Sequence, residues 1–156
     1  MIIKGLQKLT LLDFPGRVAC TLFTDGCNFR CPFCHNASLV LADRKRDEAI
    51  GEEELFSFLK DRRGILTGVC VTGGEPTLMP DLADFLQKIK DMGYAVKLDT
   101  NGYRPEVLES LISGGLVDYV AMDIKNSRES YARTVGLDKF DIGKIERSTE
   151  LLTPSR

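Results

Sequence analysis

Residues 69–102, VCVTGGEPTLMPDLADFLQKIKDMGYAVKLDTNG, contain a complete strand–helix–strand pattern. The short apolar run Val69–Thr72 predicts a buried strand. The stretch Asp81–Met92 places apolar side chains at helical spacing and is followed by Gly93, so it predicts a helix that ends there. Tyr94–Asp99 predicts the next strand. Two apolar strands separated by a helix of about ten residues are typical of a βαβ unit in a parallel sheet.

The same alternation continues on both sides of this unit. Further strands are predicted at Arg17–Thr24 and Val117–Asp123, and further helices at Glu52–Asp61, Pro105–Ser113 and Ile142–Leu152. The pattern amounts to about four βα units, so we expect an α/β fold built on a parallel sheet. A chain of 156 residues can bury one sizeable core, and residues 1–156 are therefore expected to form a single domain.

The composition excludes several classes of protein. With 21 Lys and Arg against 23 Asp and Glu, the chain has no basic excess with which to bind nucleic acid. It has no apolar run of about 18 residues that would predict a membrane span. Its N-terminus lacks a signal-peptide pattern, so we expect a soluble cytoplasmic protein. The charged run 43–48, DRKRDE, is predicted to be a solvated loop.

The polar and glycine-rich clusters of the sequence all follow predicted strands. They lie at residues 27–34, 73–77, 99–102 and 123–125. The carboxyl ends of parallel strands meet at one end of a sheet, where α/β folds carry their chemistry. We therefore expect these four clusters to form one site.

Three of the five cysteines form the spacing C-x3-C-x2-C on the first of these loops: Cys27, Cys31 and Cys34. Thiolates at this spacing predict a metal site that holds either zinc or an iron–sulfur cluster. A closed zinc site would need His35 as its fourth ligand, although we expect His35 to bond a loop carbonyl instead. A cluster held by three cysteines would leave one iron open to a substrate. Cys20 and Cys70 lie in predicted strands and are expected to be buried core residues.

Several motifs resemble, in order and spacing, those of the radical S-adenosylmethionine (SAM) superfamily. The spacing C-x3-C-x-aromatic-C, with Phe33 as the aromatic residue, is similar to its cluster motif. Gly73–Pro76 resembles its GGE segment after the second strand. The segments 99–102 and 123–125 resemble its motifs after the third and fourth strands.

The resemblance implies a partial (βα) barrel of the radical SAM type and assigns roles to the site residues. A [4Fe-4S] cluster with one iron open to SAM would be held by Cys27, Cys31 and Cys34. The residues expected to bind SAM are Phe33 near the adenine, Gly73 and Gly74 at the methionine part, Glu75 at the amino group, Asp123 and Lys125 near the ribose and carboxylate, and Asp99 and Asn101 at the same mouth. No catalytic residue is expected beyond the cluster and the SAM site.

Two further segments resemble the glycyl-radical-enzyme activating branch of this superfamily, specifically the anaerobic ribonucleoside-triphosphate reductase activating proteins. They are residues 10–16, TLLDFPG, and the junction Cys34–Asn36. The resemblance implies that a donor such as a flavodoxin or ferredoxin reduces the cluster and that SAM is then cleaved to a radical. This radical would take a hydrogen atom from a glycine of a partner enzyme. Pyruvate formate-lyase or another protein is the alternative partner.

The barrel of this superfamily usually has about six βα units, two more than the sequence predicts. The resemblance therefore implies a radical SAM core whose C-terminal strands are missing. A complementing barrel fragment or a second copy of the chain would complete it. The alternative is a remnant that binds a cluster or zinc without cleaving SAM.

Overall fold

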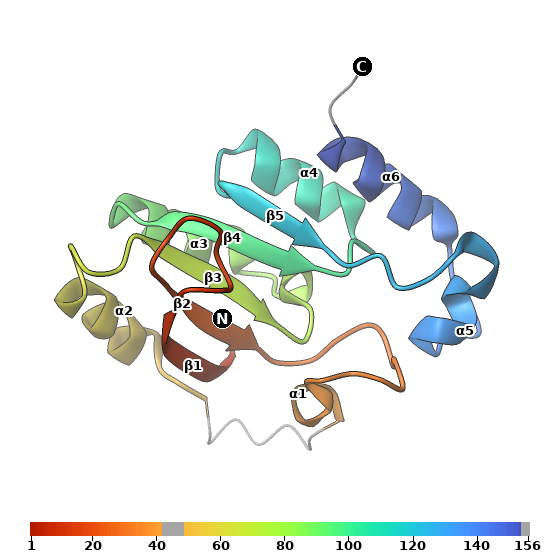
Figure 1. The fold of residues 1–156 in the computed structure, drawn as a ribbon, viewed down its shortest axis with the longest axis horizontal. Helices are drawn as coiled ribbons and strands as arrows, with labels where there is room; N and C mark the ends of the chain where they lie inside the picture. The colour runs from red at the N-terminus through yellow and green to blue at the C-terminus, as the bar shows by residue number, and fades with distance from the viewer. Residues whose placement is uncertain (42–48, 154–156) are drawn as a thin grey trace.

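A five-stranded sheet forms the centre of the computed structural model, which describes residues 1–41 and 49–153. The strands, in sheet order, are β1 (Ile3–Thr10), β2 (Ala19–Thr24), β3 (Gly68–Gly73), β4 (Ala95–Thr100) and β5 (Tyr119–Met122). β1 is antiparallel to β2, whereas β2 to β5 are parallel. The arrowheads of the parallel strands β2 to β5 point to one end of the molecule in Figure 1. The loops that the sequence assigned to the site lie at this end.

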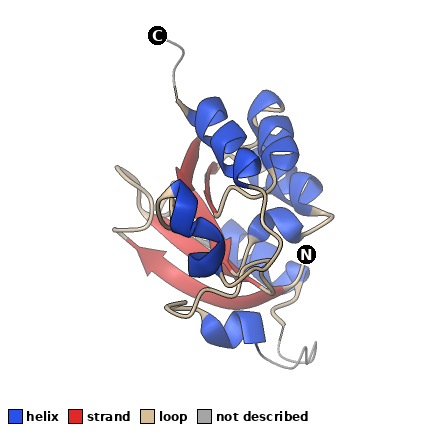
Figure 2. Cartoon of the chain, turned by 90° about the vertical axis from the view of Figure 1, so that its right-hand side faces the viewer, coloured by secondary structure: helices blue, strands red, loops and turns tan. Residues whose placement is uncertain are grey.

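Helices connect the parallel strands. They are α2 (Glu52–Asp61), α3 (Leu82–Asp91) and α4 (Pro105–Ser113), and a further helix, α6 (Ile142–Leu152), follows β5. The loops carry the short helices α1 (Ala37–Leu41) and α5 (Tyr131–Val135) and the 3-10 turns η2 (Pro76–Leu78) and η3 (Arg128–Ser130). Figure 2 looks at the end where β2 to β5 finish and shows loops in front of the strands. Within the described ranges, no helix is long and apolar enough to cross a membrane.

One face of the sheet packs against the helices and forms the main core. Its buried strand residues are Cys20, Leu22, Val69, Val71, Val96 and Leu98. They pack with side chains of α2, α3 and α4 such as Leu59, Phe85 and Leu108. Successive side chains of a strand point to opposite faces, so the alternate residues lie on the other face. We call this the inner face, and it carries Thr21, Cys70 and Lys97.

The loop between β1 and β2 lies over the inner face of the sheet (Figure 1). Its Phe14 is 3% exposed and packs with Ala19 and Ala95. A side-chain carbon built on Gly68 would lie 2.8 Å from the Phe14 ring, so the ring occupies the space that a larger residue would need. The loop therefore closes the half of the inner face near the amino ends of β3 and β4.

The predicted α/β class is confirmed, and α2, α4 and α6 match the predicted helices residue for residue. Three elements were not predicted: the antiparallel edge strand β1 and the short helices α1 and α5. β1 buries only Ile3 and Thr10, so its sequence lacks the alternation that marks a half-buried strand. The charged run 43–48 lies outside the described residues.

Candidate functional site

A cavity of about 380 Å³ opens at the carboxyl ends of the parallel strands. It is lined by every residue that the sequence assigned to the site: Cys27, Cys31, Phe33, Cys34, Gly73, Gly74, Glu75, Asp99, Asn101, Asp123 and Lys125. These residues come from four loops that are far apart in the sequence. The fold therefore brings the predicted clusters together, as the parallel topology required.

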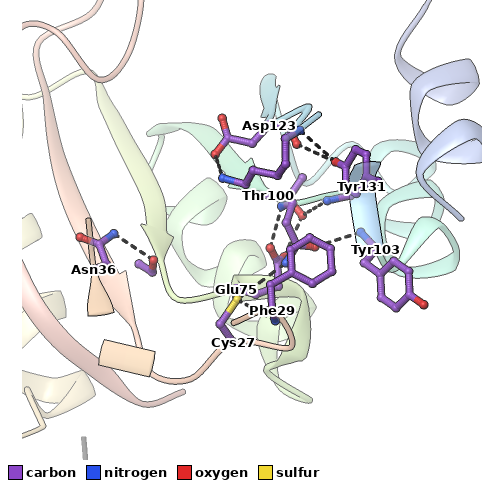
Figure 3. A network of polar contacts seen from close by, with 12 residues as sticks. Cys27, Phe29, Asn36, Glu75, Thr100, Tyr103, Asp123 and Tyr131 are labelled. Carbon is purple, nitrogen blue, oxygen red and sulfur yellow. Dashed lines mark hydrogen bonds and ion pairs between the residues drawn. The ribbon is translucent and has the colours of Figure 1, made fainter. Parts of the chain in front are cut away.

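The cysteine loop follows β2 and is held against β4 (Figure 3). The Cys27 Sγ accepts hydrogen bonds from the Phe29 N–H at 3.4 Å and from Asn101 Nδ2 at 3.8 Å. Asn101 Nδ2 also donates to Asn28 Oδ1 at 2.7 Å. The Arg30 guanidinium donates to the carbonyl oxygens of Cys27 and Phe29 at 2.6 and 2.7 Å. These contacts fix the first half of the loop.

The thiols of Cys27 and Cys31 lie in a partly buried environment. Burial raises the pKa of both thiols, and the nearby Lys125 ammonium opposes this effect at Cys31. A coordinating metal deprotonates a thiol outright, so metal binding offsets the cost of forming these thiolates. The environment therefore suits metal ligands better than free nucleophiles, whose pKa values are depressed.

A single zinc ion and an iron–sulfur cluster require different arrangements of their ligands. Among residues 1–41 and 49–153, no three His, Cys, Asp or Glu side chains converge as the ligands of one metal ion would. A cluster binds each thiolate at a different iron, so its three cysteines need only line one cavity. Cys27, Cys31 and Cys34 do so, with His35 beside them. The residues present therefore fit a [4Fe-4S] cluster.

Cys20 and Cys70 are fully buried, as predicted, and neither lines the cavity. Burial raises the pKa of each thiol to about 12. Cys20 belongs to the main core. Cys70 lies on the inner face, where its thiol donates to Asp99 Oδ2 at 3.5 Å.

The Glu75 side chain is 1% exposed and binds groups of two loops. Its Oε1 accepts from the Thr77 N–H at 3.1 Å, from Thr77 Oγ1 at 2.6 Å and from Thr100 Oγ1 at 2.7 Å. Its Oε2 accepts from the Asn101 N–H at 2.7 Å. Burial raises the pKa of this carboxyl group, while the hydrogen bonds lower it. The resemblance assigns Glu75 to the amino group of SAM, whereas its oxygens are engaged with the loops after β3 and β4.

Gly73 and Gly74 lie where the end of β3 passes the end of β2. A side-chain carbon on Gly73 would lie 2.2 Å from the Thr24 N, and one on Gly74 would lie 1.8 Å from the Gly26 O. Gly73 also has a φ of +118°, which side chains rarely permit. The sequence suggested that these glycines make room for the methionine part of SAM. The packing of the chain against itself already requires glycine at both positions.

The end of β4 and the loop after β5 each present a carboxylate paired with a lysine. Asp99 forms an ion pair with Lys97, and Asp123 Oδ2 lies 2.7 Å from Lys125 Nζ. Burial lowers the pKa of Lys125, but the hydrogen bond that it donates to Asp123, together with electrostatic interactions with Asp123, Cys31 and Tyr131, raises the pKa overall. Lys125 therefore stays charged at the cavity.

A second, small core beside the cysteine loop was not predicted. It consists of Phe29, Tyr131, Val135 and Ile145. Phe140 stacks on both Tyr103 and Tyr131, with ring centroids 5.0 and 5.1 Å apart. The Tyr131 hydroxyl accepts from the Lys125 N–H at 3.2 Å and lies 3.3 Å from the Asp123 carbonyl oxygen, to which it donates. This core therefore joins the cysteine loop to the loop after β5.

The end of α5 lies directly against the cysteine loop. The Arg30 N–H donates to the Val135 O at 2.8 Å. A side-chain carbon on Gly136 would lie 2.6 Å from the Arg30 O, and Gly136 has a φ of +67°. The aromatic residues of this region follow neither helical nor strand spacing, so hydrophobic periodicity could not identify them. Gly136, at the end of a short helix, is the one local signal.

Comparisons with known proteins agree with these features. The profile of the Radical SAM superfamily matches residues 21–153. Over 135 residues the chain is 36% identical to a protein of Methanocaldococcus jannaschii named as a glycyl-radical enzyme activating enzyme, covering 86% of this chain and 54% of that protein. Over 131 residues it is 34% identical to the pyruvate formate-lyase-activating enzyme of Clostridium pasteurianum, covering 80% and 52% respectively. The chain thus spans about half the length of these curated relatives.

The fold also resembles a solved structure. The crystal structure of QueE from Escherichia coli matches 97% of this chain and 75% of that chain, with a TM-score of 0.55 and 19% sequence identity. At this identity the likeness concerns the fold alone. It agrees with the partial barrel expected from the sequence.

Proposed function

The chain belongs to the radical SAM superfamily, and on this basis we propose that it is a cytoplasmic enzyme that binds a [4Fe-4S] cluster and SAM and forms a glycyl radical on a partner enzyme. One observation carries the proposal. The three cysteines of the C-x3-C-x2-C motif share one cavity with the polar ends of β3, β4 and β5. The names of the relatives support the activating role.

The cysteine loop would hold the cluster through Cys27, Cys31 and Cys34, which leaves one iron without a protein ligand. When bound and reduced by an external donor, this group would pass one electron to SAM for its reductive cleavage, and the resulting radical would take a hydrogen atom from a glycine. The chain itself positions SAM and keeps other reactants away. The hydrogen bonds that Asn101 donates to Cys27 and Asn28 hold the cysteine loop in place beside the SAM-binding residues.

The other cavity residues would bind SAM. The Phe33 ring is 53% exposed at the cavity and would pack against the adenine. The Lys125 ammonium would attract the SAM carboxylate, and Asp123 would accept hydrogen bonds from the ribose hydroxyls. Gly73 and Gly74 would present backbone groups to the methionine part. Glu75, whose oxygens are occupied, would act by holding Asn101 and its neighbours in place.

The partner that we propose is an anaerobic ribonucleotide reductase, on the evidence of residues 10–16 and 34–36. A flavodoxin or ferredoxin would supply the electron. Pyruvate formate-lyase is the second candidate, because a relative 34% identical to this chain is named as its activating enzyme. Adding each partner separately and recording the glycyl radical by electron paramagnetic resonance would decide between them.

Anaerobic reconstitution with iron and sulfide tests the proposal itself. We expect the reduced protein to give a cluster signal in electron paramagnetic resonance that changes when SAM is added, and 5′-deoxyadenosine to form on turnover. A cluster signal that SAM leaves unchanged would indicate a protein that binds the cluster without cleaving SAM. Zinc in place of iron would overturn the mechanism.

A further inference from the structure

A buried lysine lies on the inner face of the sheet, next to the cavity. Lys97 is 6% exposed and precedes Asp99 by two residues, so both side chains lie on the same face of β4. Asp99 lines the cavity. Strands inside a parallel sheet are usually apolar, and lysine is rarely buried unless it is paired. A charged residue in the middle of β4 therefore calls for an explanation.

The Lys97 ammonium lies over the Tyr119 ring, 6.0 Å from its centroid, and its polar contacts are with Asp99 and Cys70. Lys97 Nζ pairs with Asp99 Oδ1 and lies 3.8 Å from the Cys70 Sγ. The Cys70 thiol donates to the second oxygen, Asp99 Oδ2, at 3.5 Å. Each carboxylate oxygen is thus held by a different partner from the inner face. The Asp99 side chain keeps 31% of its surface exposed.

Electrostatics keep Lys97 charged. Burial lowers the pKa of Lys97, but the hydrogen bond that it donates to Asp99, together with its electrostatic interactions with Asp99 and Cys70, raises the pKa overall. Burying such an ion pair is a weak source of stability, because apolar side chains of similar volume usually serve as well. The pair is therefore better explained by what it does to Asp99 than by what it adds to folding.

We propose that Lys97 is a positioning residue, which holds the Asp99 carboxylate in a fixed orientation as a hydrogen-bond acceptor for bound SAM. The inference rests on the proposed function. A carboxylate has about four acceptor positions, so Asp99 retains free ones after binding Lys97 and Cys70. The amino group and the ribose hydroxyls of SAM are donors of the required kind. Fixing an acceptor before the ligand arrives lowers the cost of binding.

A double-mutant cycle on the full, cluster-loaded chain tests the proposal, with the SAM dissociation constant measured by equilibrium dialysis of labelled SAM. We expect Lys97→Met to weaken SAM binding about fivefold or more. Because Lys97 acts through Asp99, Lys97→Met should cause no further loss in the Asp99→Asn background. A residue that only supports the fold would add its effect in both backgrounds. The matched control is Lys90→Met, which removes the exposed Lys90–Asp118 ion pair away from the cavity and should leave SAM binding unchanged.

Three outcomes would overturn the inference. An unchanged dissociation constant in Lys97→Met, or additive losses in the double variant, would exclude a role through Asp99. Wild-type chain that holds a cluster but does not bind SAM would overturn the proposed function as well. If circular dichroism shows that Lys97→Met does not fold, Cys70→Ala removes the other support of the same carboxylate. Cys70→Ala should weaken SAM binding less than Asp99→Asn does, and it should cause no further loss in the Asp99→Asn background. Any other result counts against the inference.

Discussion

The Glu75 carboxylate contacts two of the loops that line the cavity. Thr77 lies in the loop after β3, while Thr100 ends β4 and Asn101 follows it. A buried donor that loses its acceptor costs about 1–3 kcal/mol. The main role of the Glu75 side chain is therefore to fix the position of one loop relative to the other.

We predict that Glu75→Gln destabilises the chain by about 1–3 kcal/mol and weakens SAM binding, while cluster content stays the same. Glutamine places an NH2 group where one of the donors now finds an oxygen. Thermal unfolding, iron content and equilibrium dialysis measure the three effects. Glu106→Gln, at an exposed ion pair with Arg104, is the control. Weaker SAM binding without any loss of stability would point to direct contact between Glu75 and SAM.

A second prediction for single residues concerns the cysteines. Replacing any one cysteine of the motif by alanine should abolish full cluster content, which is read as iron and sulfide per chain after reconstitution. Cys20→Ala and Cys70→Ala should retain the cluster, because both thiols are buried in strands and neither lines the cavity. Equal losses in the two groups would contradict the ligand assignment.

Among the elements, the cysteine loop depends on two neighbours that are distant in sequence. The residue after β4, Asn101, contacts the loop on one side, and the end of α5 contributes Val135 and Gly136 on the other. Without α5, the Arg30 N–H would lose its backbone acceptor. The part of the chain after β5 therefore helps to position the cysteine loop.

Gly136→Ala should make the cluster easier to remove. The new methyl group would lie 2.6 Å from the Arg30 O in the cysteine loop. Gly115→Ala is the matched control, since its φ of +65° resembles the +67° of Gly136 but nothing lies within 4 Å of the added carbon. Both variants should lose about 1–2 kcal/mol of stability through backbone strain. Only Gly136→Ala should lose iron faster to a chelator, and equal rates would refute the link between α5 and the loop.

The sequence predicted the elements whose side chains follow a regular period. α3 has buried Leu82, Phe85 and Ile89 on one stripe, and the motifs after the strands converge because parallel topology demands it. Periodicity could not predict the second core, because Phe29 and Tyr131 meet through loops. Nor could it predict Lys97, whose position in β4 depends on a partner two residues away on the same strand face.

At the scale of the whole molecule, the described residues form one large core and two smaller clusters of buried side chains. The main core lies between the sheet and the helices, and the second lies beside the cavity around Phe29 and Tyr131. Regions with fewer buried apolar contacts open more readily than the rest of a protein. The cavity end should therefore be the less stable end of the molecule.

Hydrogen exchange can measure this difference. In the cluster-free protein, amides of β3 and β4 should exchange slowest, while those of α5 and the cysteine loop exchange faster. Loading the cluster should slow exchange in α5 and the loop and leave β3 and β4 nearly unchanged, because ligand binding stabilises the region that it contacts. Uniform slowing across the chain would indicate a single cooperative unit instead.

The close approach of β2 and β3 at Gly73 and Gly74 also affects how such sequences are recognised. The two glycines are required wherever these strand ends meet as they do here, because a side chain would collide with the backbone at Thr24 or Gly26. A descendant that had lost its cofactor would still need them in order to fold. A Gly-Gly pair at this position is thus a signature of architecture, and it does not separate working enzymes from inactive ones. Residues with side chains free to meet a ligand, such as Phe33, are the better markers of activity in a genome survey.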